Sequence, residues 1–158
     1  MAERKRVAEA RQRQARAVQV GEHVEGIVSS IGPKLQRLRR EQRLSLQQLA
    51  VRAEVSAAAI HKIERNDMVP TITTLLKLGA ALARLGRMEE ARQAFSESVR
   101  LDPSDAEAHN ALGAVLAELK RDREAIVEFT EAVRLQPGLT HAYAYRGLSL
   151  ATLGDLKG

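Results

Sequence analysis

The second half of the chain repeats itself every 34 residues. Glycine and phenylalanine recur at this period, at Gly79, Gly113, Gly147, Phe95 and Phe129. The segment 88–103, MEEARQAFSESVRLDP, matches the segment 122–137, DREAIVEFTEAVRLQP, at eight of sixteen positions. A repeat of this length is one supersecondary unit that cannot bury its apolar face alone, so neighbouring units must stack. We therefore expect an all-α fold in which short helical hairpins form a solenoid.

The repeated residues have physical roles in such a hairpin. The small residues Gly79 and Gly113 allow two helices to approach closely, and Phe95 and Phe129 fill the space between neighbouring hairpins. A proline near the end of each unit stops the second helix. This pattern of Leu-Gly, Ala, Phe and a closing Pro resembles the tetratricopeptide repeat, whose repeats commonly bind a protein or peptide.

The resemblance implies a repeat region over residues 72–158. Two full repeats cover 72–105 and 106–139, and residues 140–153 supply only the first helix of a third. We expect that last helix to stack on the preceding one and to cover Phe129. The apolar residues at the spacing of its packing face are Tyr143, Leu150 and Leu153.

Two helix starts in the repeats are expected from local residue types. Ser104, followed three residues later by Glu107, predicts a capping box for the helix that begins the second repeat. Asp122 stands where the repeat family has a large residue after the turn, so we expect it to cap the next helix.

The first half of the chain contains two short helices joined by a few residues. Ser45 opens LQQLAVRA with a capping box, and Ser56 precedes AAAIHKIER. Helices joined this tightly form a helix-turn-helix pattern. The stretch 31–82 resembles the repressor-like helix-turn-helix family, which contains phage repressors and Cro proteins. The resemblance implies a DNA-binding domain over 29–85, whose last helix, 71–85, is also the first helix of the repeats.

The same resemblance makes residues 57–65 the recognition helix. Its residues that would face base edges are Ala57, Ala58, His61 and Lys62. Alanine can contact only a thymine methyl group, which leaves His61 and Lys62 as the base-reading groups. The alternatives are a half-exposed surface histidine and a solvated lysine. The candidates for phosphate contacts, which would fix the register on DNA, are Ser45, Gln47, Arg52, Ser56 and Arg65.

Three other residues of this domain carry expectations. Arg39 and Glu64 match a family ion pair that joins the first helix to the third, and we interpret this pair as structural. Glu54 stands in the turn where the family usually has glycine. A positive φ there strains a glutamate, so the turn is predicted to be distorted or strained.

The charge of the chain is divided unevenly. Residues 1–70 hold 14 Lys and Arg against 8 Asp and Glu, a net charge of +6, whereas residues 71–158 hold 11 against 12, a net charge of −1. A basic half beside a near-neutral half is typical of a polyanion-binding module joined to a second module. Residues 1–28 form a basic arm, which is either a solvated tail or a segment that follows the DNA backbone.

Several classes of protein are disfavoured. The chain has no cysteine, and its four histidines are scattered without metal-ligand spacing. There is no Gly-rich phosphate loop and no catalytic constellation, so we expect no enzyme activity, no metal and no cofactor. No apolar run approaches the roughly 20 residues of a membrane span, and we expect a cytoplasmic protein.

These patterns predict a DNA-binding transcriptional regulator with double-stranded DNA and a protein or peptide as partners. The alternative is an interaction adaptor in which the helix-turn-helix no longer reads DNA, and Ala57 and Ala58 favour it. A homodimer is also expected, because one helix-turn-helix reads only a short site. Its candidate interfaces are the end of the repeats and the apolar stretch 24–31.

Overall fold

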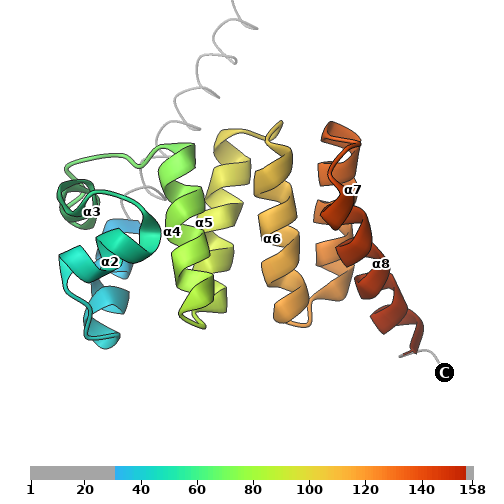
Figure 1. The fold of residues 1–158 in the computed structure, drawn as a ribbon, viewed down its shortest axis with the longest axis horizontal. Helices are drawn as coiled ribbons and strands as arrows, with labels where there is room; N and C mark the ends of the chain where they lie inside the picture. The colour runs from blue at the N-terminus through green and yellow to red at the C-terminus, as the bar shows by residue number, and fades with distance from the viewer. Residues whose placement is uncertain (1–30, 156–158) are drawn as a thin grey trace, which may run out of the picture. The chain divides into compact units, whose positions relative to one another are not determined.

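The computed structural model describes residues 31–155, and these residues form α-helices without any strand (Figure 1). Residues 31–41 are helical. They are followed by α2 (Leu46–Ala53), α3 (Ala57–Glu64), α4 (Ile72–Arg84), α5 (Met88–Leu101), α6 (Ala106–Glu118), α7 (Asp122–Leu135) and α8 (Thr140–Asp155). The all-α prediction is therefore confirmed. The predicted basic arm 1–28, and the apolar stretch 24–31 except for its last residue, lie outside the described residues.

The chain divides into two compact units, the first made of Met1–Ser45 and Ala58–Val69, the second of Leu46–Ala57 and Pro70–Gly158. This division assigns α2 to the same unit as α4 to α8. The domain limits expected from the sequence, 29–85 and 72–158, remain a prediction.

In the second unit, α4 to α8 lie side by side in chain order (Figure 1). Helices α4 and α5 form one hairpin and α6 and α7 form the next. Two glycines permit the close approach within each hairpin, because a Cβ atom on Gly79 would lie 2.7 Å from a ring atom of Phe95. The equivalent atom on Gly113 would lie 2.8 Å from the ring of Phe129. Both phenylalanines are buried, so these contacts form the core of the repeats.

Helix α8 packs on α7 through residues other than those expected. Phe129 is fully buried, and the ring of Tyr145 stacks on it with centroids 5.8 Å apart. The buried residues of this segment are Leu139, Ala142 and Ser149. The prediction that Tyr143 and Leu150 form the packing face is wrong, because both are exposed. The physical reason is that Ala142, Tyr145 and Ser149, which lie on the packed side of α8, are on a different face of the helix from Tyr143 and Leu150.

The start of α6 also differs from expectation. Asp105 is the N-cap of α6, and its carboxylate accepts hydrogen bonds from the backbone N–H groups of Glu107 (3.0 Å) and Ala108 (3.2 Å). The predicted cap, Ser104, instead donates from its backbone N–H and its hydroxyl to the carboxylate of Asp102. The capping box is wrong by one residue, because the aspartate one position later supplies a charged acceptor next to the helix dipole.

The predicted cap at the start of α7 is wrong as well. Asp122 is the first residue of α7 and is buried, and the N-cap residue is Arg121, which makes no side-chain capping bond. Arg121 instead donates to the carboxylate of Glu124 at 2.6 and 2.7 Å. An equivalent pair, Arg87 with Glu90, lies at the start of α5, so the ion pair repeats with the 34-residue period.

In the first unit, residues 31–41 and α3 share a small apolar core that includes Leu35, Leu38 and Ile63. The two segments approach closely, because a Cβ atom on Gly32 would lie 2.1 Å from the carbonyl oxygen of Ile63.

Among residues 31–155, every helix is too short or too polar to span a lipid bilayer.

Candidate nucleic-acid interface

Helix α3 presents one exposed face and one buried face. Its buried residues are Ile60, Ile63 and Glu64. The exposed residues are Ala58, His61, Lys62 and, just after the helix, Arg65. Their spacing of i, i+3, i+4 and i+7 puts neighbouring side chains on one surface of the helix. The structure therefore brings four of the predicted site residues together on one face.

The cations on this face differ in their partners. Arg65 donates from Nε to the carboxylate of Asp67 at 2.9 Å, and both side chains are exposed. Within residues 31–155, the side chains of His61 and Lys62 make no hydrogen bond or ion pair. An external anion therefore need not displace any partner of Lys62 among the described residues.

The charge of the first unit supports an anionic partner. Its described residues, 31–45 and 58–69, hold seven Lys and Arg against three Asp and Glu, a net charge of +4. The described residues of the second unit, 46–57 and 70–155, hold 11 against 13, a net charge of −2. The positive charge of the described chain is thus concentrated in the unit that contains α3.

The other predicted contact residues have these positions. Ser45 is exposed and belongs to the first unit, whereas Gln47, Arg52, Ser56 and Ala57 belong to the second. Of these four, Gln47, Arg52 and Ser56 are exposed and Ala57 is half-buried.

The end of α2 is tied to α4 within the second unit. Arg84 donates from Nη2 to the carbonyl of Arg52 at 2.6 Å, and Lys77 donates from Nζ to the carbonyl of Glu54 at 3.2 Å. Glu54, in the turn that follows α2, has a φ of 52°. This left-handed backbone is strained for a glutamate, and the bond from Lys77 to its carbonyl helps to hold it.

Arg39 and Glu64 form a two-pronged ion pair inside the first unit. Arg39 donates from Nε to Oε1 at 2.6 Å and from Nη2 to Oε2 at 2.8 Å. Its Nη1 donates to the carbonyl of Leu44 at 3.0 Å. The side chains are 13% and 1% exposed. The hydrogen bonds to Glu64 hold the pKa of Arg39 above its ordinary value, so the guanidinium stays charged beneath the surface.

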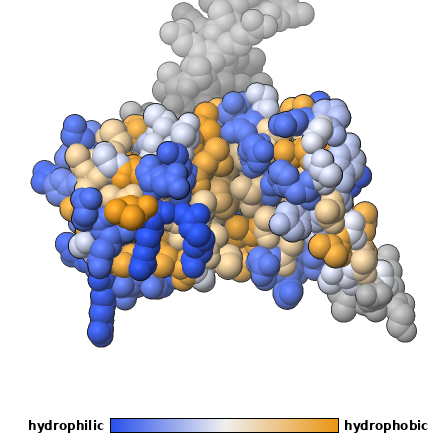
Figure 2. All heavy atoms as spheres, in the orientation of Figure 1, coloured by the Kyte–Doolittle hydropathy of each residue, from blue (hydrophilic) through white to orange (hydrophobic). Residues whose placement is uncertain are grey.

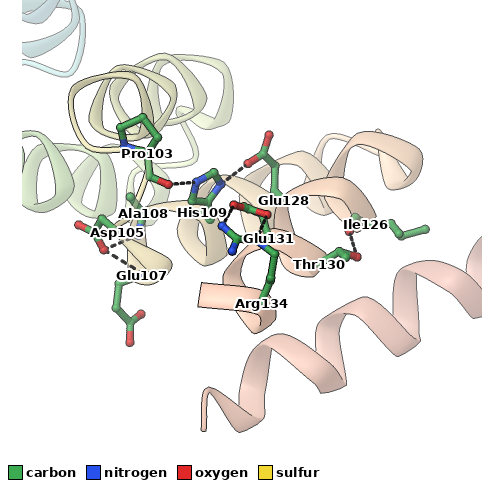
Figure 3. A network of polar contacts seen from close by, with 10 residues as sticks. All are labelled: Pro103, Asp105, Glu107, Ala108, His109, Ile126, Glu128, Thr130, Glu131 and Arg134. Atoms are coloured by element: carbon green, nitrogen blue, oxygen red, sulfur yellow. Dashed lines mark hydrogen bonds and ion pairs between the residues drawn. The ribbon is translucent and has the colours of Figure 1, made fainter. Parts of the chain in front are cut away.

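The repeats contain a polar cluster that the sequence analysis did not find. Figure 3 shows the ring of His109 between the Pro103 carbonyl and the Glu128 carboxylate. The Nδ1 atom lies 2.7 Å from Glu128 Oε2, and Nε2 lies 3.1 Å from Pro103 O. Both ring nitrogens thus lie within hydrogen-bond distance of an oxygen atom. The cluster joins α6, α7 and the loop before α6, and its members are too far apart in sequence to form a local motif.

Exposed apolar side chains concentrate on α8. These are Tyr143, Tyr145, Leu148 and Leu150. Apolar surface is visible over this part of the chain in Figure 2. A surface of this kind is available for contact with another protein.

Family models match both parts of the chain. A helix-turn-helix family model matches residues 35–84. A TPR repeat model matches residues 79–120, and a tetratricopeptide repeat model matches residues 106–139. No curated protein matches the chain.

Among solved structures, a crystal structure of MamA aligns with a TM-score of 0.59 at 18% identity, covering 76% of this chain and 75% of that one. A second crystal structure of MamA protein has a TM-score of 0.57 at 24% identity and covers 82% of this chain. The aligned region spans 66% of that second chain. At these identities the likeness concerns the fold alone, and it supports a helical solenoid.

Proposed function

For a chain that fuses a helix-turn-helix segment to tetratricopeptide repeats, we propose the function of a DNA-binding transcriptional regulator whose repeats bind a protein or peptide. The observation that carries the proposal is the exposed face of α3, where Lys62 has no partner among residues 31–155 and the described residues of its unit carry a net positive charge. We further propose that the protein is not an enzyme, acts in the cytoplasm and binds DNA as a homodimer.

In this proposal the residues of α3 divide into two roles. Lys62 and His61 reach base edges, and Ala57 and Ala58 can contact thymine methyl groups. Ser45, Gln47, Arg52, Ser56 and Arg65 contact phosphates and fix the register without reading sequence. Arg65 is already paired with Asp67, so a phosphate must compete with that carboxylate. Sequence preference therefore depends mainly on Lys62 and His61.

The second candidate function is a protein-interaction adaptor in which the helix-turn-helix does not read DNA. Two observations favour it. The helix offers alanine at Ala57 and Ala58, where hydrogen-bonding side chains would discriminate bases better, and Arg65 is neutralised by its neighbour. An adaptor of this kind would bind duplexes weakly and without sequence preference.

Duplex binding at several salt concentrations tests the proposal. Selection from a random DNA pool first defines a preferred site. Lys62→Ala is then expected to cost about 1–3 kcal/mol on that site and to relax one base position. Arg52→Ala is expected to weaken all duplexes alike and to reduce the salt slope. Arg123→Ala, an exposed change of equal charge in α7, is the matched control and should alter neither property. If both Lys62→Ala and Arg52→Ala bind every duplex as the parent does, the assignment of α3 as the recognition helix is wrong. If the selection yields no preferred site and binding is weak, the adaptor function is favoured instead.

A further inference from the structure

The helix 31–41 ends in a turn that contains a strained arginine. The backbone N–H of Arg43 donates to the carbonyl of Arg40 at 2.9 Å, and the N–H of Leu44 donates to the carbonyl of Arg39 at 3.0 Å. These two bonds form a Schellman motif, and Arg43 takes its left-handed position, with a φ of 53°. Glycine is the usual residue there, because a Cβ atom is strained in this conformation. The arginine side chain is therefore carried at a position where the backbone disfavours it.

The repeats contain the same motif twice, once with glycine and once with lysine. Gly86 follows α4 and has a φ of 73°, and its equivalent 34 residues later, Lys120, follows α6 and has a φ of 61°. Their backbone N–H groups donate to the carbonyls of Ala83 and Ala117, both at 2.9 Å. Lys120 thus combines a left-handed backbone with a positive charge, as Arg43 does. It lies, however, in the unit whose described residues have a net charge of −2.

The surroundings of Arg43 favour an anionic partner. Its side chain is exposed, and among residues 31–155 it makes no hydrogen bond or ion pair. The nearby carboxylate of Glu41 lies 3.6 Å from Nε of Arg37. The described residues of this unit carry a net charge of +4. An anion that approaches Arg43 therefore displaces no partner among the described residues, and the charge of the unit attracts it.

The turn is fastened to α3 by the guanidinium of Arg39. This group donates from Nη1 to the carbonyl of Leu44 at 3.0 Å, and from Nε and Nη2 to the carboxylate of Glu64 at 2.6 and 2.8 Å. One side chain thus holds both the residue that follows Arg43 and the proposed recognition helix. Ser45, a proposed phosphate contact, is two residues after Arg43.

We propose that Arg43 binds a phosphate of the DNA backbone beside the contact made by Ser45. This inference rests on the proposed DNA-binding function and adds a contact that the sequence analysis missed. A guanidinium can donate two parallel hydrogen bonds to phosphate oxygens. Such a contact reads no bases, so it raises the affinity for every duplex alike. Backbone strain is commonly stored at binding sites, which accounts for a side chain at this left-handed position.

Arg43→Gly and Lys120→Gly form a matched pair of variants. Each removes one positive charge and one strained side chain from a Schellman motif, and the dipole of the preceding helix acts on both positions alike. Both variants should unfold at an unchanged or higher urea concentration, because glycine adopts the left-handed backbone without strain. Arg43→Asn also suits this backbone, so it should bind DNA as Arg43→Gly does.

The full chain is titrated by fluorescence anisotropy against a labelled duplex of mixed sequence, about two helical turns long, at several salt concentrations. Arg43→Gly should reduce the slope of log affinity against log salt concentration by about 0.9, the contribution of one phosphate contact, whereas Lys120→Gly should keep the parent slope. The ratio of parent to Arg43→Gly affinity should therefore fall about 3.5-fold between about 50 mM and about 200 mM salt. Arg43→Lys should retain most of the slope, because lysine also neutralises one phosphate.

The results distinguish this contact from DNA binding itself. If the parent binds the duplex and Arg43→Gly keeps the parent affinity and slope, the phosphate contact is overturned and the DNA-binding function stands. Equal losses in Arg43→Gly and Lys120→Gly would also overturn it, because they would assign the effect to net charge. If the parent does not bind the duplex, the DNA-binding function fails and the contact fails with it.

Discussion

The buried ion pair of the first unit permits a quantitative test by a double-mutant cycle. Replacing Glu64 by methionine leaves the Arg39 guanidinium, 13% exposed, without the two acceptors at 2.6 and 2.8 Å. Replacing Arg39 by methionine leaves a carboxylate that is 1% exposed without a cation. Removing one partner of a buried pair typically costs about 3–5 kcal/mol, and we expect each single variant to lose this amount.

The double variant should be more stable than either single one. Two methionines leave no unpaired charge and can fill the irregular space, so most of the loss is recovered. The pKa of Arg39 is raised by its hydrogen bonds to Glu64. Stability from a raised pKa is present below the unfolded pKa and is lost only as pH rises through the folded one. For an arginine this lies above the neutral range, so the guanidinium of the parent chain stays charged there.

The assay must report on the first unit, because the repeats dominate the helical signal. Amide hydrogen exchange of residues 57–64 with urea titration provides the local free energy of opening. The exposed pair Arg65–Asp67 supplies the control, and Arg65→Met should cost about 1 kcal/mol or less. Additive losses in the double variant would refute the interpretation that Arg39 and Glu64 brace each other.

Three further outcomes are expected. Gly113→Ala should lower the unfolding free energy by about 1–3 kcal/mol, because its Cβ would lie 2.8 Å from the Phe129 ring; thermal melts measure this. Ser98→Ala should leave stability unchanged or raise it by up to about 1 kcal/mol in urea titration, because the buried Ser98 hydroxyl has no partner among the described residues. The pKa of Glu131 is lowered, mainly by its hydrogen bond to Arg134. The stability that this pair contributes is therefore present above pH 4.5, the ordinary pKa, and is lost as the pH falls through the lowered pKa. NMR titration of Glu131 in the parent and in Arg134→Gln checks the direction of the shift.

Repetition explains why the fold could be predicted from the sequence. The same spacing of glycine and phenylalanine occurs in both hairpins, and in the structure Gly79 faces Phe95 and Gly113 faces Phe129. The helix starts were less predictable, because several capping residues compete within one loop. The N-cap of α6 is Asp105, one residue after the predicted Ser104.

The parts that the sequence did not reveal depend on contacts between distant segments. His109 lies 19 residues from Glu128 and on another helix, so no local pattern signals their contact. The packing face of α8 was predicted wrongly for a similar reason. Hydrophobicity favoured Tyr143 and Leu150, whereas both are exposed and α8 contacts Phe129 through the ring of Tyr145.

Comparing the repeats also shows how neighbouring helices are matched. Leu75 and His109 occupy the same position in successive repeats, on α4 and α6. Ala94 on α5 and Glu128 on α7 form a second equivalent pair. The first hairpin has Leu75 on α4 and Ala94 on α5. The second has His109 on α6 and Glu128 on α7, and the distance from His109 Nδ1 to Glu128 Oε2 is 2.7 Å. Ala94 and Glu128 each immediately precede the buried phenylalanine of their helix. The residue pair changes together between the two hairpins, from two apolar side chains in α4 and α5 to an imidazole and a carboxylate in hydrogen-bond distance in α6 and α7.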